Sequence, residues 1–86
     1  MKKIIFSKHA IEKLDILRKH GLNLKSDIIE KVIKDADHIE HGYKDRLIAQ
    51  KELDLIHVLR VVFEETESNI KVITFYPGRK DRYEKH

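Results

Sequence analysis

Hydrophobic residues recur at helical spacing in two segments near the start of the chain. In the first, apolar residues three or four positions apart follow Ser7 and stop before Gly21, and in the second they follow Ser26. Serine suits a helix start because its hydroxyl can accept a backbone N–H, and glycine can adopt the left-handed conformation that ends a helix. The pattern predicts helices over residues 7–20 and 26–36.

The period of the hydrophobic pattern changes to two after the second predicted helix, which is the spacing of a strand with one buried face. With a short segment at the start of the chain, five candidate strands are expected: residues 3–6, 37–40, 46–51, 55–64 and 70–76. Consecutive strands joined by short turns pair antiparallel, because a parallel pair needs a long crossover. Pro77 lacks the N–H that a strand ladder needs, so the last strand is expected to end there.

Together these elements predict an α+β fold in which two N-terminal helices pack on one face of an antiparallel sheet. A chain of 86 residues fits one domain, residues 1–86, with a basic tail at 79–86. Two helices can cover one face of the sheet and leave the other open to solvent or to a partner. Arg60 and Tyr76 alternate in phase with valine and threonine neighbours, so we expect them on one mixed, partly exposed surface.

The composition excludes several classes of function. The chain has no cysteine, which rules out disulfides, thiol chemistry and cysteine-ligated metal sites. Its three glycines stand apart, so there is no glycine-rich phosphate loop and no cofactor is expected. His38 and His41 fall in a predicted strand and turn, where their spacing does not converge on a metal ion, so no metal site is expected. The apolar runs are too short for a bilayer span or a signal peptide, and we expect a cytoplasmic protein without membrane association.

Positive charge is concentrated at the two ends of the chain. Residues 1–25 carry a net +5, residues 26–69 a net −5 and residues 70–86 a net +3. If the ends meet in the fold, they form one basic patch, which is the electrostatic footprint of a polyanion partner. The alternative is ordinary charge scatter over a solvated surface.

The C-terminal segment combines cations and phenols within eight positions: Tyr76, Arg79, Lys80, Arg82 and Tyr83. Arginine forks suit phosphate oxygens, and a tyrosine can stack on an unpaired base or donate a proton. The segment therefore predicts contacts with single-stranded RNA, and the alternative is a solubilising basic tail.

Two further residues are candidates for chemistry. His9 falls in the first turn of a predicted helix, where the positive end of the helix dipole disfavours the imidazolium form and leaves a neutral base. Arg60 lies in the middle of a predicted strand, where it can stabilise a transition-state charge or, in the simpler interpretation, pair with a neighbouring carboxylate. The corresponding alternative for His9 is an exposed helix-start histidine without a chemical task.

Two segments resemble a known family: Ser7-Lys8-His9-Ala10-Ile11-Glu12-Lys13-Leu14 and Val72-Ile73-Thr74-Phe75-Tyr76-Pro77-Gly78-Arg79-Lys80-Asp81-Arg82-Tyr83. They are similar to a family of small uncharacterised prokaryotic proteins grouped with the RelE/ParE-like toxins, within the wider barnase-like ribonuclease group. The resemblance implies a compact toxin fold that cleaves RNA without a metal, using basic and tyrosine side chains of the sheet and tail. ParE-like relatives share the fold and inhibit a topoisomerase instead, so fold alone does not determine activity.

The resulting hypothesis is a toxin-like, metal-independent endoribonuclease that acts on RNA, free or on the ribosome, with a small antitoxin protein as a second partner. The predicted catalytic residues are His9, Arg60 and Tyr83. The predicted substrate-binding residues are Tyr76, Arg79, Lys80 and Arg82. His9 or Tyr83 would remove the proton from a ribose 2′-OH, and the arginines would stabilise the charge on the attacked phosphate. The alternatives are a non-enzymatic protein that blocks a protein or RNA target, and a family member that keeps the fold without catalysis.

Overall fold

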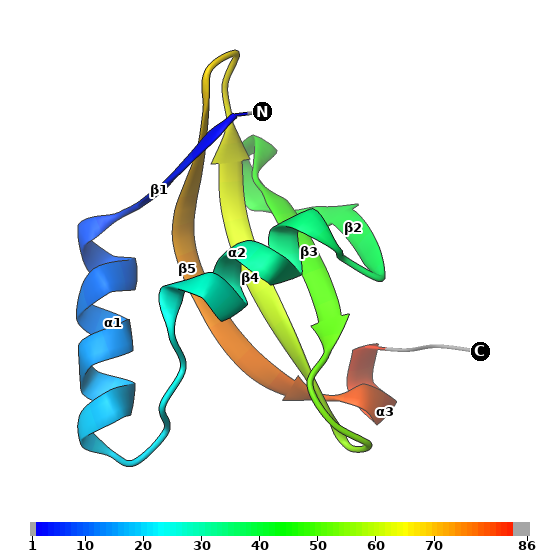
Figure 1. The fold of residues 1–86 in the computed structure, drawn as a ribbon. Coiled ribbons are helices and arrows are strands. Elements are labelled where there is room, and N and C mark those ends of the chain that lie inside the picture. Colours follow the sequence, from blue (N-terminus) through cyan, green and yellow to red (C-terminus); the bar gives the residue numbers. More distant parts are fainter. Residues whose placement is uncertain (1, 84–86) are drawn as a thin grey trace.

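The computed structural model describes residues 2–83, so residues 84–86 of the predicted basic tail lie outside the described residues, as does residue 1. The elements follow in the order β1 Lys3–Phe6, α1 Lys8–Lys19, α2 Ser26–Lys34, β2 His38–His41, a 3₁₀ turn Tyr43–Asp45, β3 Leu47–Glu52, β4 His57–Glu65, β5 Asn69–Arg79 and α3 Lys80–Tyr83. The α+β fold class and the two N-terminal helices are confirmed (Figure 1). None of the helices in this part of the chain is long and apolar enough to cross a membrane.

The five strands form one mixed sheet in the order β1-β5-β4-β3-β2. The last four strands in the sequence pair antiparallel through short connections, as predicted. β1 instead pairs parallel with β5, with Lys3 opposite Asn69, so the prediction of a purely antiparallel sheet is wrong at this edge. The reason is that both long helices and three strands separate β1 from β5 along the chain, which provides the long connection that a parallel pair needs.

β5 continues as far as Arg79, past Pro77, where the sequence predicts its end. β1 pairs only with residues 69–72, so beyond that point β5 has a neighbouring strand on one side only. Pro77 lies there, opposite Leu59 of β4. Proline is tolerated at such an edge because its missing N–H can fall on the unpaired side of the strand. The extension carries Gly78 and Arg79 along β4 and determines where α3 begins.

The start of α1 matches the prediction, whereas the start of α2 does not. Ser7 Oγ accepts a hydrogen bond from the Ala10 N–H at 3.0 Å and donates one to the Ile73 carbonyl at 2.8 Å. The predicted cap therefore also attaches the helix to β5. In α2 the cap position is Lys25, in an extended conformation and without a side-chain hydrogen bond, and Ser26 is already the first helical residue.

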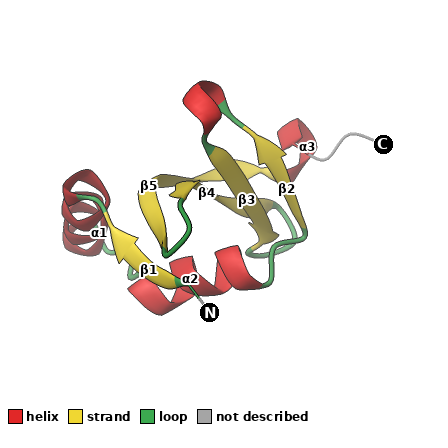
Figure 2. Cartoon of the chain, turned by 90° about the horizontal axis from the view of Figure 1, so that it is seen from above, coloured by secondary structure: helices red, strands yellow, loops and turns green. Residues whose placement is uncertain are grey.

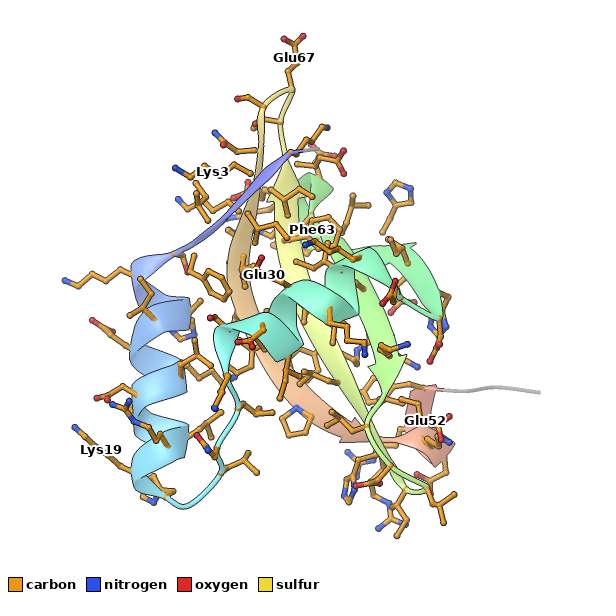
Figure 3. The ribbon with its side chains drawn as sticks, viewed as in Figure 1. Lys3, Lys19, Glu30, Glu52, Phe63 and Glu67 are labelled. Atoms are coloured by element: carbon orange, nitrogen blue, oxygen red, sulfur yellow. The ribbon has the colours of Figure 1, made fainter. Side chains whose placement is uncertain are left out.

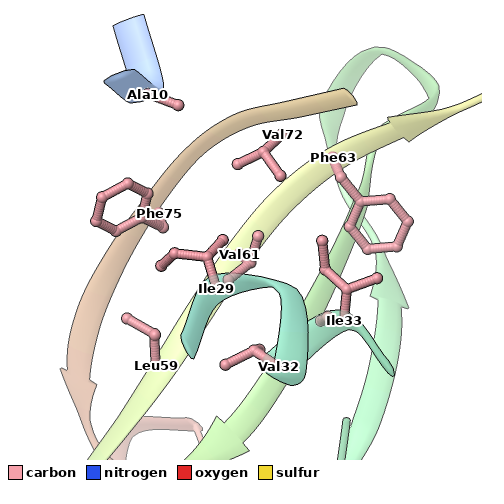
Figure 4. Packing of buried hydrophobic residues seen from close by; sticks show 10 residues of the cluster. Ala10, Ile29, Val32, Ile33, Leu59, Val61, Phe63, Val72 and Phe75 are labelled. Carbon is pink, nitrogen blue, oxygen red and sulfur yellow. The ribbon is translucent and has the colours of Figure 1, made fainter. Parts of the chain in front are cut away.

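The hydrophobic core lies between α2 and one face of the sheet (Figures 2 and 4). α2 buries Ile29, Val32 and Ile33 there, and α1 adds Ala10 from its position beside β5. The sheet contributes Ala49, Leu59, Val61, Phe63, Val72 and Phe75 to this face. A register shift in the β4–β5 ladder leaves Ile73 without a partner and puts Val72 on the same face as Phe75, where strict alternation would separate them. Each large apolar side chain buried in this way stabilises the fold by roughly 1.5–3 kcal/mol.

The two basic ends of the chain lie side by side along part of the sheet, because β1 pairs with the start of β5 and α1 packs beside it. α1 flanks β5 and β1 at one side of the sheet, whereas α3 follows the far end of β5 (Figures 1 and 2). The sequence does not predict α3, which brings Tyr83 against the sheet face opposite α2. The expected single basic patch stays a prediction: the two segments are in contact, and Arg79 and the cations of α3 lie at the other end of β5 from its pairing with β1.

Candidate functional site on the uncovered face of the sheet

A row of polar side chains crosses the sheet on the face opposite α2. In the strand register, Gln50 of β3, Arg60 of β4 and Tyr76 of β5 lie directly opposite one another. Their neighbours along the strands, such as Val61 and Phe75, point into the core, so the row points the other way. The prediction that Arg60 and Tyr76 share one surface is confirmed.

Arg60 is the centre of this row, and its side chain is only 6% exposed. Its Nε donates to the Tyr76 hydroxyl at 3.1 Å, and its Nη1 donates to Gln50 Oε1 at 2.5 Å. Its Nη2 donates to Glu40 Oε1 of β2 in an ion pair. The Tyr83 ring lies over the guanidinium, with its centroid 4.1 Å from Cζ. We call these five residues the Arg60 cluster: Glu40, Gln50, Arg60, Tyr76 and Tyr83. In it the buried guanidinium has the hydrogen-bond and charge partners that a buried cation requires.

The charge on Arg60 is fixed by its surroundings. Burial disfavours the charged guanidinium, but the hydrogen bonds to Tyr76 and Glu40 outweigh this effect and raise its pKa above the usual value. Glu40 is 48% exposed, and only one of its oxygens is bonded within residues 2–83. Tyr76 accepts from Arg60, so its own hydroxyl hydrogen can be donated elsewhere. The cluster thus offers an acceptor and a donor on either side of a permanent positive charge.

Tyr83 reaches the guanidinium because α3 folds back over the end of β5. The Lys80 N–H donates to the Ile56 carbonyl at 2.7 Å, and the Lys80 ammonium pairs with Glu52 Oε1 at 2.7 Å, at the end of β3 beside α3 (Figure 3). Gly78 leaves room for the ring, since a Cβ at this position would lie 2.4 Å from Tyr83 Cε2. A glycine is therefore required here by the close packing of the tyrosine.

Gly78→Ala is expected to displace the Tyr83 ring from Arg60. The substitution changes none of the residues of the Arg60 cluster itself. Overpacking of this kind costs roughly 1–3 kcal/mol, which chemical denaturation measures, and the α3 amides should exchange hydrogen faster. Gly42→Ala is the matched control, because its Cβ would approach the flexible Ile48 side chain at 3.2 Å. Equal losses of stability in the two variants would contradict the packing role of Gly78.

Lys13 of α1 reaches the Tyr76 side of the Arg60 cluster, although the sequence pattern does not single it out. Its Nζ lies 5.5 Å from the centroid of the Phe75 ring and 6.0 Å from that of the Tyr76 ring, which is cation–π range. Burial lowers the pKa of this ammonium. The signal that could have identified it is a lysine among the apolar residues Ala10 and Leu14 on the inner side of the helix.

His9 lies outside the Arg60 cluster. It is exposed in the first turn of α1, one turn before Lys13. Residues four apart lie on the same side of a helix, so His9 is on the side of α1 from which Lys13 approaches Tyr76. It makes no hydrogen bond or ion pair with any residue between positions 2 and 83. Its predicted role as a base remains a prediction.

Two tyrosines of the predicted tail join the Arg60 cluster, whereas its three cations do not. Arg79 points to the opposite face of the sheet, where it lies across from His57 of β4 and has its Nε 3.4 Å from Asp81 Oδ1. Lys80 is held in the ion pair described above, and Arg82 is exposed on α3. The tail therefore places its cations around the end of the sheet.

Two members of the Arg60 cluster, Glu40 and Gln50, carry no signal in their local sequence, because their contacts depend on strand register. Gln50 Nε2 is buried and has no hydrogen-bond partner among the described residues. No group of three or more His, Asp or Glu side chains in residues 2–83 is placed to hold a metal ion. The groups at the cluster instead suit a ligand with hydrogen-bond acceptors and flat rings.

Comparisons of the chain with protein-family models, with curated proteins and with solved structures found no match. The function must therefore be inferred from the Arg60 cluster and its surroundings.

Proposed function

We propose that the chain is a metal-independent endoribonuclease of the RelE-like toxin type, which cuts RNA through attack of a ribose 2′-OH on the adjacent phosphate. The observation that carries this proposal is the Arg60 cluster, in which an arginine and two tyrosines meet on the sheet face opposite α2, beside the cations of α3. Aromatic rings and arginine planes stack on unpaired bases, and arginine forks bind phosphate, so the combination suits single-stranded RNA. The reaction needs no metal because the nucleophile belongs to the substrate.

In this proposal Arg60 positions Tyr76 and Tyr83 and supplies a permanent positive charge beside them. Its guanidinium already donates to three side chains and is covered by Tyr83. An incoming phosphate would therefore meet exposed cations at the end of the sheet first, namely Arg82 of α3 and Arg79 on the opposite face of β5. Cations beside the attacked phosphate stabilise the charge that develops on it. For the general base, the sequence offers His9 and Tyr83.

The proposal includes two partners. RNA, free or on the ribosome, is the substrate. A toxin also implies a small antitoxin protein that neutralises it, and an adjacent reading frame that encodes a small acidic helical product would support this part of the proposal. Co-expression of that product is expected to relieve growth arrest caused by the chain.

The test is cleavage of single-stranded RNA by the purified protein in the presence of EDTA, with or without ribosomes. The expected products carry a 2′,3′-cyclic phosphate and a 5′-hydroxyl. Tyr83→Phe keeps a ring over Arg60 and removes the hydroxyl, so a rate loss of roughly 10²–10⁴-fold is expected if Tyr83 is the base. Tyr43→Phe is the matched control, since Tyr43 is an exposed turn residue outside the Arg60 cluster. Absence of cleavage under all these conditions would contradict the enzyme proposal.

A second candidate function is non-enzymatic blocking of a protein or RNA target. The observation that favours it is the saturation of Arg60, whose hydrogen-bonding and stacking partners all come from the chain itself. Growth arrest by a protein that leaves RNA intact would support this candidate over the enzyme. A protein that neither cuts RNA nor arrests growth would indicate a family member that keeps the fold without activity.

A further inference from the structure

The hairpin turn between β3 and β4 holds a carboxylate–imidazole pair outside the Arg60 cluster. Asp54 Oδ1 accepts the backbone N–H of Ile56 at 2.8 Å and that of His57 at 2.7 Å, which fixes the carboxylate. Its two oxygens lie 3.0 and 3.1 Å from His57 Nδ1. The turn thus orients an imidazole by means of a carboxylate that the backbone itself holds.

This contact determines which nitrogen of His57 is available. An ionised carboxylate only accepts hydrogen bonds, so the imidazole hydrogen resides on Nδ1 and Nε2 keeps its lone pair. The backbone N–H groups of Ile56 and His57 lower the pKa of Asp54, which keeps the carboxylate charged near neutral pH. The His57 side chain is 46% exposed, so a substrate can approach Nε2. A neutral imidazole oriented in this way is suited to accept a proton.

Arg79 lies opposite His57 on the neighbouring strand. His57 and Arg79 are direct partners in the β4–β5 register, and such partners project to the same face of a sheet. The Arg79 side chain is exposed, and only its Nε has a partner within residues 2–83, Asp81 at 3.4 Å. Its two Nη groups can therefore bind phosphate oxygens beside the imidazole.

We propose that His57 is the general base of RNA cleavage, that Asp54 is its positioning residue and that Arg79 binds the scissile phosphate. The inference rests on the ribonuclease function proposed above and assigns its base to a residue other than His9 or Tyr83. The 2′-O–H bond of the ribose breaks and the proton moves to Nε2 of His57. O2′ bonds to phosphorus as the P–O5′ bond breaks. The 5′-oxygen takes a proton from water, and the imidazolium returns its proton to the hydroxide that remains.

The His57 site has features that His9 lacks. His9 has no hydrogen-bond partner among the described residues to fix its tautomer, and it lies on α1, away from the cations of the tail. His57 has a carboxylate at Nδ1 and is paired with Arg79 in the strand register. The sheet ladder holds the backbone of the base and that of the phosphate-binding residue at a constant separation. Such fixed positions favour proton transfer from a bound substrate.

The charged groups around His57 give the expected pH dependence. Asp54 faces Nδ1, and Arg79 of β5 is the register partner of His57. α3 adds Lys80, which is ion-paired with β3, and Asp81, which is paired with Arg79. The base must be unprotonated to act, so the cleavage rate is expected to rise from acid to neutral pH.

His57→Gln is expected to slow cleavage of single-stranded RNA by roughly 10²–10⁴-fold and to abolish the rise with pH. His20→Gln is the matched control, because it makes the same change in an exposed histidine at the end of α1. Asp54→Asn keeps the oxygen that the turn N–H groups need and removes the charge. It is expected to slow cleavage and to move the imidazole toward the Nε2–H tautomer, since the amide can donate to Nδ1. Circular dichroism checks that each variant is folded.

The outcomes separate this inference from the function on which it rests. If the parent cuts RNA and His57→Gln cuts equally fast, the assignment of His57 is wrong and the ribonuclease function stands. If the parent cuts no RNA, both proposals fail. Nitrogen NMR of the imidazole in the parent is an independent measurement, with Nδ1–H expected for His57. A predominant Nε2–H tautomer would overturn the assignment whatever the RNA assay gives.

Discussion

Arg60→Ala is expected to lower the free energy of unfolding by about 3 kcal/mol, the size typical of removing a charge-assisted donor and leaving buried partners unsatisfied. The Arg60 side chain is 6% exposed and donates to Tyr76, Gln50 and Glu40. Without it, Gln50, which is itself buried, loses the partner of its oxygen, and Tyr83 loses the cation beneath its ring. Urea denaturation measures the loss.

Glu40→Gln is the matched control for the opposite end of the same ion pair. Glu40 is 48% exposed, so water can replace its contact with Arg60, and the expected cost is at most about 1 kcal/mol. A cost as large as that of Arg60→Ala would show that the ion pair itself, and not the full set of contacts around the guanidinium, stabilises this face.

Phe75→Ala is the second change with a large expected effect, a loss of roughly 3–5 kcal/mol. Phe75 is fully buried between the sheet and α2, and its removal leaves a cavity that the packed neighbours Val61 and Ile29 cannot fill (Figure 4). The ring also supports Lys13, whose Nζ lies 5.5 Å from its centroid. Because small domains have total stabilities of roughly 5–15 kcal/mol, much of the protein is expected to unfold at moderate urea concentrations.

Leu55→Ala is the matched control for the loss of a large apolar side chain. Leu55 is 89% exposed in the turn between β3 and β4, so its truncation is expected to change the free energy of unfolding by no more than about 0.5 kcal/mol. A similar midpoint for Leu55→Ala and Phe75→Ala in thermal and urea denaturation would contradict the placement of Phe75 in the core.

The sequence by itself determined the local elements. Helical and strand periods depend on residues two to four positions apart, so both long helices and all five strands are found near their predicted bounds. Ser7 caps α1, and Gly21 has the predicted left-handed conformation, with φ of +85°, because each needs only its immediate neighbours. Strand parity likewise placed Arg60 and Tyr76 on one face.

Only the tertiary structure decided how distant segments combine. Glu40 and Gln50 meet Arg60 through the register of three strands, which depends on the summed pairing of whole ladders. The parallel pairing of β1 with β5 is likewise a long-range choice. Successive side chains of a strand point to opposite faces, so Arg79 lies on the face opposite Arg60, although both belong to the predicted RNA site.

The turn after β5 also combines features that the sequence predicts with contacts that only the tertiary structure creates. Tyr83 and Gly78 are visible in the sequence as a phenol and a strand breaker, yet their relation arises only when α3 folds back and the ring needs the space that the glycine leaves. His57 is similar, because its carboxylate partner is local, whereas Arg79 is placed opposite it only by the β4–β5 ladder. Spacing along the chain determines which side chains share an element. The packing of elements, in which burial and backbone pairing over many residues act together, determines which side chains form a site.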